Sequence, residues 1–277
     1  MPAFTRLVRF AQGDSAYYGD LLDTQDGEYN IRKLLGTPFT KLEDAGEVVK
    51  TKTPKLLCPL ETTPIFQCIG VNYKAHSEET TMDLPENPAV FTKPADALAG
   101  PFDDVKVHPD ARSMLDWEAE LAFVVGKDAK NVSEEDAMDY ILGYTASNDV
   151  SARNFQIPDV CGWQFGYAKS FDGFAPIGHT IVSAETVPNP LEARITTKVN
   201  GVIKQDSNTN DLIFGVSRLL SHLSRGTTVR AGTIVMTGTP SGVAWSREPK
   251  EFLKDGDVVE IEVEGIGMIR NTMKFVD

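Results

Sequence analysis

Two glutamates separated by a single residue are the clearest sign of chemistry in this sequence. Glu118 and Glu120 belong to the run DWEAE at 116–120, which leads into the apolar segment 121–125. In a strand, residues i and i+2 point to the same face, so these carboxylates would lie roughly 7 Å apart, at about 3.3 Å per residue. Two like charges on an otherwise apolar strand repel each other unless a cation lies between them.

A third acid, Asp149, ends another strand-like run at 144–149. If that run pairs with the first, three carboxylates converge, and an all-oxygen ligand set favours Mg²⁺, Mn²⁺ or Ca²⁺ over Zn²⁺. The alternative for the Glu-x-Glu pair is the solvated polar face of an edge strand. The four histidines lack the spacing of a zinc site.

His76 differs from the other histidines because it lies in a polar stretch that follows Gly70. On a helical turn, His76 and Glu79 are neighbours at i and i+3. A carboxylate beside an imidazole selects its tautomer and raises its basicity, as a general base requires. The alternative is an ordinary surface ion pair.

The elements that must position these groups are mainly strands. Apolar runs predict strands over 4–10, 121–125, 233–237 and 258–263. We expect a helix near 31–35, a second at about 134–141, where Ser133 and Asp136 are placed as a capping box, and a third at 211–224, whose apolar residues share one face. The expected fold is therefore α+β with a β-rich core. Prolines at 54, 59 and 64 favour a connector, so we expect a small N-terminal domain over 1–60 and a catalytic domain over 61–277.

Composition narrows the possible partners. The 277 residues include 27 Lys and Arg and 40 Asp and Glu, a formal charge of −13, which makes a nucleic-acid partner unexpected. No apolar run is long enough to span a membrane, and no glycine-rich phosphate motif is present. Three widely spaced cysteines favour a reducing compartment, the cytoplasm. Arg6 and Arg9, with no acid before Asp14, leave a mitochondrial presequence open.

Six ordered motifs together resemble the fumarylacetoacetate hydrolase superfamily. They are IGVNYKAH at 69–76, FTKP at 91–94, DWEAEL at 116–121, NDVSAR at 148–153, KSFD at 169–172 and TGTPSGV at 237–243. The short N-terminal unit and the FLKDGD segment at 252–257 look most similar to the domain-containing protein 2 branch. The resemblance implies a mixed β-roll.

The resemblance also implies roles for particular residues. The implied ligands of Mg²⁺ or Mn²⁺, with Ca²⁺ as a further option, are Glu118, Glu120 and Asp149. The implied catalytic residues are Lys169, His76 and Glu79. Lys169 would face the substrate's 2-oxo oxygen, and His76 with Glu79 would form a general-base dyad on a mobile lid at about 73–87. The implied substrate-binding residues are Tyr73, Arg153, Gln156 and Thr239.

Three functions are compatible with these residues. The preferred one is metal-dependent hydrolysis of a carbon–carbon bond in an acylpyruvate or other β-diketo acid, through an enolate that the cation stabilises. The alternative is an oxaloacetate keto–enol tautomerase or decarboxylase that uses the same residues. The third is a non-catalytic binder of metal and carboxylate, which the joint presence of base, ligands and lysine disfavours. In each case the partner is a small anionic 2-oxo acid, and the expected assembly is a homodimer.

Overall fold

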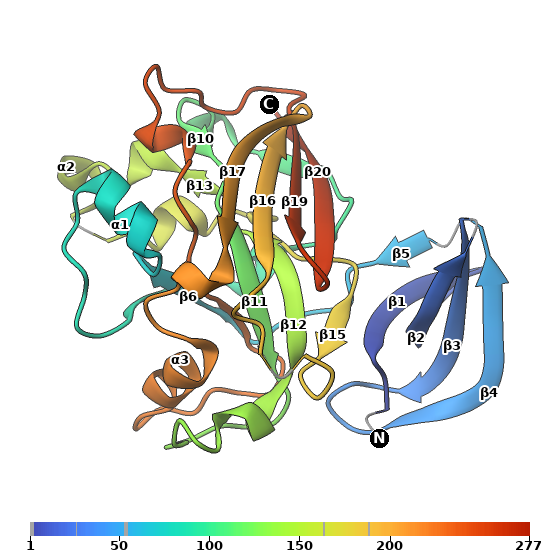
Figure 1. The fold of residues 1–277 in the computed structure, drawn as a ribbon. Helices are drawn as coiled ribbons and strands as arrows, with labels where there is room; N and C mark the ends of the chain where they lie inside the picture. The colour runs from blue at the N-terminus through green and yellow to red at the C-terminus, as the bar shows by residue number, and fades with distance from the viewer. Residues whose placement is uncertain (1–2, 26, 53–54, 163, 188) are drawn as a thin grey trace.

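Strands dominate the chain, as its apolar runs predict. The computed structural model describes residues 3–25, 27–52, 55–162, 164–187 and 189–277. Its strands build two main sheets, and short helices lie at their margins (Figure 1). The β-rich α+β fold expected from the sequence is confirmed. Among the described residues, no helix is long and apolar enough to cross a membrane.

The larger sheet contains eleven strands of the described chain, in the order β4-β3-β2-β1-β15-β12-β11-β18-β6-β7, with β5 paired to β1. Its strands are β1 (Arg6–Gln12), β2 (Ser15–Gln25), β3 (Glu28–Gly36), β4 (Leu42–Thr51), β5 (Lys55–Leu57), β6 (Phe66–Gly70), β7 (Ala89–Lys93), β11 (Ala119–Val125), β12 (Ile141–Asn148), β15 (Ile181–Ser183) and β18 (Ile234–Met236). β6 and β18 run parallel, which places residues 66–68 beside residues 234–236.

A second sheet of five strands packs against this one. Its order is β17 (Val202–Asn208), β16 (Arg194–Val199), β19 (Val258–Val263), β20 (Gly267–Phe275) and β9 (Val105–Val107). Leu121 and Phe123 of β11 share a buried core with Ile261 of β19, whereas Ala122 and Val124 point into a separate core on the opposite face. Both faces of β11 are covered, so every residue of this strand is buried.

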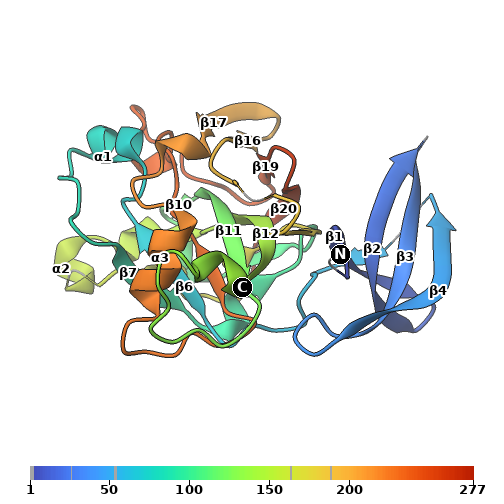
Figure 2. The same ribbon diagram turned by 60° about the horizontal axis from the view of Figure 1, so that its bottom comes forward.

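The first four strands lie to one side of the molecule, and both views separate them from the helices α1 (Lys74–Thr80) and α2 (Pro158–Cys161) (Figures 1 and 2). β1 pairs with β15, so this unit continues the larger sheet. Four short strands complete the fold as two pairs, which are β10 (Leu115–Asp116) with β13 (Ser151–Ala152), and β8 (Leu98–Ala99) with β14 (Ala175–Pro176). The division into domains at residue 60 stays a prediction.

The helices differ most from expectation. The helix predicted near 31–35 is wrong, because β3 occupies these residues and pairs with β2 and β4. Five residues are too few for a stable helix when two neighbouring strands can satisfy the backbone instead.

The helix predicted at 134–141 is also wrong. Ser133 does contact Asp136, with the Asp136 N–H 3.1 Å from Ser133 Oγ, but only a 3₁₀ turn over Ala137–Tyr140 forms. β12 begins at Ile141 and pairs with β11, so the residue that was expected to end the helix is the first residue of a strand.

The α-helices of the described part of the chain are α1 (Lys74–Thr80), α2 (Pro158–Cys161) and α3 (Val216–Leu223). α3 begins five residues later than the predicted 211–224. A 3₁₀ turn over Thr209–Asp211 comes first, and the backbone N–H groups of Ile213 and Phe214 then donate to Asn72, at 2.8 and 2.9 Å, so that turn does not continue into α3.

Candidate active site

The three predicted metal ligands come together at the end of the β11–β12 pair. Glu118 lies just before β11, and Glu120 lies two residues on, so both point to the same face. Asp149 follows β12, and its backbone N–H donates to the Glu118 carbonyl at 3.0 Å. Oxygens of the three buried carboxylates lie within 4.8 Å of one another, so the pairing of these two runs is confirmed.

Two buried lysines neutralise part of this cluster. Lys169 Nζ lies 2.6 Å from Glu118 Oε2, 2.7 Å from Asp149 Oδ2 and 2.8 Å from Ser151 Oγ. Lys93 Nζ, at the end of β7, lies 2.6 Å from Asp149 Oδ1. No role for Lys93 was expected from the sequence, although a lysine that ends an apolar strand within a matched motif was a usable signal.

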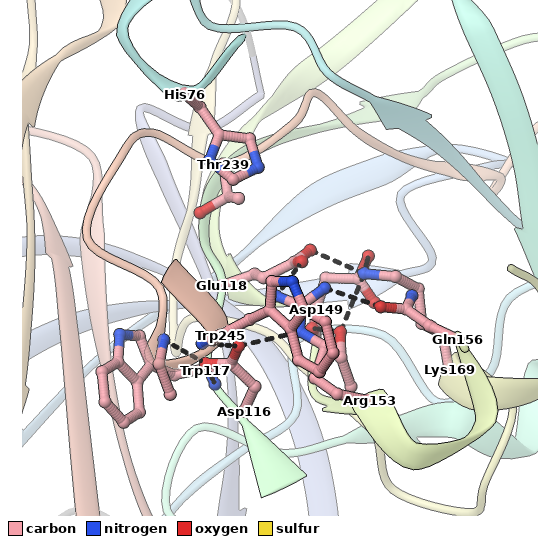
Figure 3. Close-up of polar contacts among 12 residues, drawn as sticks. His76, Asp116, Trp117, Glu118, Asp149, Arg153, Gln156, Lys169, Thr239 and Trp245 are labelled. Carbon is pink, nitrogen blue, oxygen red and sulfur yellow. Dashed lines mark hydrogen bonds and ion pairs between the residues drawn. The ribbon is translucent and has the colours of Figure 1, made fainter. Parts of the chain in front are cut away.

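Arg153 extends the network on the other side of Glu118 (Figure 3). Its guanidinium lies 2.6 Å from Glu118 Oε1, donates to Asp116 at 2.8 Å, and donates to Gln156 Oε1 at 2.8 Å. Asp116 also accepts the backbone N–H groups of Ala244 and Trp245, at 2.7 and 3.0 Å. Asp116 therefore attaches Arg153 to the 244–245 turn, a function that the sequence did not indicate.

The electrostatics of the cluster differ from one carboxylate to the next. Burial acts to raise the pKa of Glu118, but Lys169 and Arg153 lower it to about 2. Burial, with the charges of Asp149 and Glu118, raises the pKa of Glu120 well above its usual range. Burial acts to lower the pKa of Lys169, and the two carboxylates beside it raise it overall. Lys169 is therefore held as a cation.

The residues present fit a divalent cation. Burial and the charges of Asp149 and Glu118 raise the pKa of Glu120, and a divalent cation bound between these carboxylates would offset both effects. The clustered donors are carboxylate oxygens, which suit a hard ion such as Mg²⁺ or Mn²⁺. The cluster can therefore hold a metal through Glu118, Glu120 and Asp149.

The predicted general base His76 and its partner Glu79 lie together on α1. His76 Nδ1 lies 3.1 Å from Glu79 Oε2, and the other oxygen of Glu79 accepts the backbone N–H of Gly242 at 2.9 Å. Partial burial acts to raise the pKa of Glu79, but its hydrogen bonds to His76 and Gly242 lower it overall. The ionised carboxylate thus orients the imidazole and also joins α1 to the 237–243 loop.

Thr239 lies in that loop, and its position depends on two neighbours. Gly238 has φ of +100°, and a Cβ there would lie 2.8 Å from the Cβ of Asn72, so only glycine fits. The Gly238 N–H donates to Glu120 Oε2 at 2.6 Å. Gln205 of β17 donates to the Thr239 hydroxyl at 2.9 Å. Gln205 is a further positioning residue that local sequence did not reveal.

One cavity of about 410 Å³ connects these groups. His76, Glu79, Glu118, Arg153, Gln156, Lys169 and Thr239 all line it. In Figure 3, His76 and Thr239 stand apart from the network of Glu118, Asp149, Lys169 and Arg153. The volume is within the range of about 300–1,000 Å³ that is typical of small-molecule sites. The site therefore has room for a small substrate between the His76 imidazole and Glu118 with its two cations, Lys169 and Arg153.

Tyr73 is the predicted substrate contact that lies outside this lining. It is fully buried, and among the described residues its hydroxyl has no hydrogen-bond partner. Burial and the nearby charge of Glu120 raise its pKa. Its predicted role in substrate binding stays a prediction.

The structure thus defines a β-rich protein with three clustered buried carboxylates beside a cavity large enough for a small molecule. The chain belongs to the fumarylacetoacetate hydrolase family, because the model described as fumarylacetoacetate (FAA) hydrolase C-terminal matches residues 66–274. The expected superfamily is thereby confirmed, and the protein is an enzyme of that superfamily.

Relatives support both the fold and the branch. The mitochondrial oxaloacetate tautomerase fahd2 of Xenopus laevis is 36% identical over 286 residues, covering 96% of this chain and 89% of that protein. The fumarylacetoacetate hydrolase domain-containing protein 2 homolog of Dictyostelium discoideum is 43% identical, covering 79% and 74%. A solved 5-carboxymethyl-2-hydroxymuconate delta-isomerase from Mycobacterium smegmatis superposes with a TM-score of 0.85 at 33% identity, covering 98% of this chain and 100% of that one. The expected domain-containing protein 2 branch is confirmed.

Proposed function

We propose that this enzyme is a divalent-metal-dependent keto–enol tautomerase of oxaloacetate. The observation that carries the proposal is that one cavity is lined both by the His76–Glu79 pair and by the Lys169–Glu118 ion pair. Tautomerisation needs a proton to move at C3 and charge to be stabilised at the 2-oxo oxygen, and these two groups suit those two tasks. The names of several relatives support the same choice.

In the proposed reaction, the enol hydroxyl loses its proton to solvent, and protonated His76 donates a proton to C3 of the resulting enolate. In the reverse direction His76 takes the C3 proton and solvent returns a proton to the oxygen. Glu79 stabilises the imidazolium and holds its ring in place. The Lys169 ammonium lies beside the 2-oxo oxygen and stabilises negative charge on it. Thr239 and the amides of its loop hold the C1 carboxylate, with Arg153 and Gln156 nearby. Glu118, Glu120 and Asp149 would hold a divalent cation, which we take to be Mg²⁺ or Mn²⁺. This cation would withdraw electron density from the 2-oxo oxygen.

The hydrolase function preferred from the sequence is not confirmed. One relative is named as an oxaloacetate tautomerase and one solved structure as a delta-isomerase, and neither name describes cleavage of a carbon–carbon bond. The tautomerase alternative is therefore the better supported of the two.

The test is product analysis by NMR with pure protein and Mn²⁺, supplied in turn with enol-oxaloacetate and acetylpyruvate. We expect conversion of enol to keto oxaloacetate faster than in buffer with the same metal, without loss of CO₂. Acetate and pyruvate released from acetylpyruvate at a comparable rate would instead support hydrolysis. Absence of any acceleration with oxaloacetate would overturn the proposal.

Two further properties belong to this proposal. The mitochondrial name of the Xenopus laevis relative supports a mitochondrial location over a cytoplasmic one, and imaging of the tagged protein would decide. A homodimer stays a prediction, and light scattering on the purified protein tests it.

A further inference from the structure

The inner cations of the cavity are already engaged by carboxylates. Lys169 contacts Glu118 and Asp149, and Arg153 contacts Asp116 and Glu118, all at 2.6–2.8 Å. A third cation, Lys250, also lines the cavity but has a different environment. Its side chain is 40% exposed, and the nearby carboxylate of Glu248 has 84% of its own side chain exposed. Lys250 Nζ lies 3.7 Å from Glu248 Oε1. Of these three cavity cations, Lys250 is therefore the one whose charge is least neutralised by neighbouring carboxylates.

The ammonium of Lys250 is held in place by Trp245. Its Nζ lies 4.8 Å from the centre of the Trp245 ring and donates to the Trp245 carbonyl at 2.5 Å. The Trp245 N–H in turn donates to Asp116, which also binds Arg153. An ammonium carries three N–H donors, so two remain for a ligand. Lys250 thus has a defined position relative to the catalytic cluster.

The cavity wall between these charges is largely apolar, with Phe91, Phe165, Val243 and Trp245 among its residues. An apolar wall with a few placed charges orients a ligand by its polar ends. The molecule carries a net charge of −13, so its surface gives an anionic ligand no general attraction. A second carboxylate must therefore be bound by a local cation.

We propose that Lys250 binds the remote carboxylate of the substrate and makes the site selective for 2-oxo dicarboxylic acids over 2-oxo monocarboxylic acids. The 2-oxo acid end lies at the Lys169 cluster, and the far carboxylate pairs with Lys250 at the cavity margin. This inference rests on the proposed function, because that function places the 2-oxo group at the cluster. It adds the residue that recognises the other end.

The experiment compares Lys250→Met with Lys250→Arg and with Lys254→Met, which removes the same charge from an exposed position on the same segment. The substrates are oxaloacetate and 2-oxobutanoate, which has a methyl group in place of the far carboxylate. Enolisation is followed as exchange of C3 protons for deuterium by NMR. We expect Lys250→Met to raise KM for oxaloacetate about 5–10-fold, with kcat within about twofold. The 2-oxobutanoate kinetics should stay unchanged, and Lys250→Arg and Lys254→Met should resemble the wild type.

A binding measurement separates this inference from the proposed function. Titration calorimetry with Mn²⁺ compares 2-oxoglutarate with 2-oxopentanoate, which differ only in the terminal group. We expect Lys250→Met to weaken binding of 2-oxoglutarate alone. If the wild type does not accelerate oxaloacetate tautomerisation, the proposed function fails while the calorimetry still decides the role of Lys250. Equal binding of the two acids by the wild type, or equal effects of Lys250→Met on both, would overturn the inference.

Discussion

Replacing Lys169 by methionine keeps the length of the side chain but removes a buried positive charge. The change breaks ion pairs of 2.6 Å to Glu118 and 2.7 Å to Asp149, and leaves both carboxylates buried. Removing one partner of a buried ion pair costs about 3–5 kcal/mol. In a protein of this size, each kcal/mol lost from the free energy of unfolding lowers Tm by about 2–4 °C. The metal-free variant should therefore melt about 6–20 °C lower than the wild type.

The same variant separates a structural role of Lys169 from a catalytic one. Saturating Mn²⁺ should recover much of the lost Tm, because the cation compensates the two carboxylates. The rate should not recover, because a charge beside the 2-oxo oxygen is worth about 2–4 kcal/mol, or roughly 10²–10³ in kcat.

Scanning calorimetry with chelator and with Mn²⁺ measures the first effect, enol-to-keto conversion measures the second, and Lys254→Met is the control for loss of surface charge. An unchanged Tm in chelator would refute the buried-charge argument. A change in KM alone would show that Lys169 only binds substrate.

Glu118→Ala should abolish Mn²⁺ binding in titration calorimetry while the circular dichroism spectrum keeps its β-rich shape; retained stoichiometric binding would contradict the ligand assignment. His76→Ala should lower kcat for oxaloacetate by about 10²–10⁴, and Glu79→Gln should lower it less, because the imidazole remains. The lowered pKa of Glu79 means that its attachment of α1 to Gly242 holds above the ordinary glutamate pKa and is lost as pH falls through the lowered value. Proteolysis of the 73–87 segment should therefore rise only in acid, and Glu79→Gln should lose this dependence. Gly238→Ala should displace the Thr239 loop and raise KM, since a Cβ would meet Asn72.

Local periodicity was enough to predict some pairs of functional groups. The two-residue repeat of a strand puts Glu118 and Glu120 on one face, and a helical turn puts His76 beside Glu79. These neighbours are two or three residues apart, so their geometry depends on the backbone conformation alone. The acid at Asp149 was found because it ends a strand-like run, although its pairing partner was open until the register of β11 and β12 was known.

Local patterns failed where distant segments competed for the same backbone. Residues 31–35 form a strand because β2 and β4 flank them, and α3 begins late because Asn72 binds the backbone of residues 213–214. No propensity within either segment contains that information, since each competing partner lies elsewhere in the chain.

The sequence by itself determined the family, the β-rich fold class and the residue types of the site, because motifs and strand periods are local properties. Only the tertiary structure decided which cations neutralise which carboxylates. Lys93 reaches Asp149 across 56 residues of sequence, and Asp116 binds the backbone of Trp245 across 129. It also placed Lys250 at the cavity margin. Such contacts follow from how whole sheets bury their faces against one another, and the free energy of that burial is shared by the entire core.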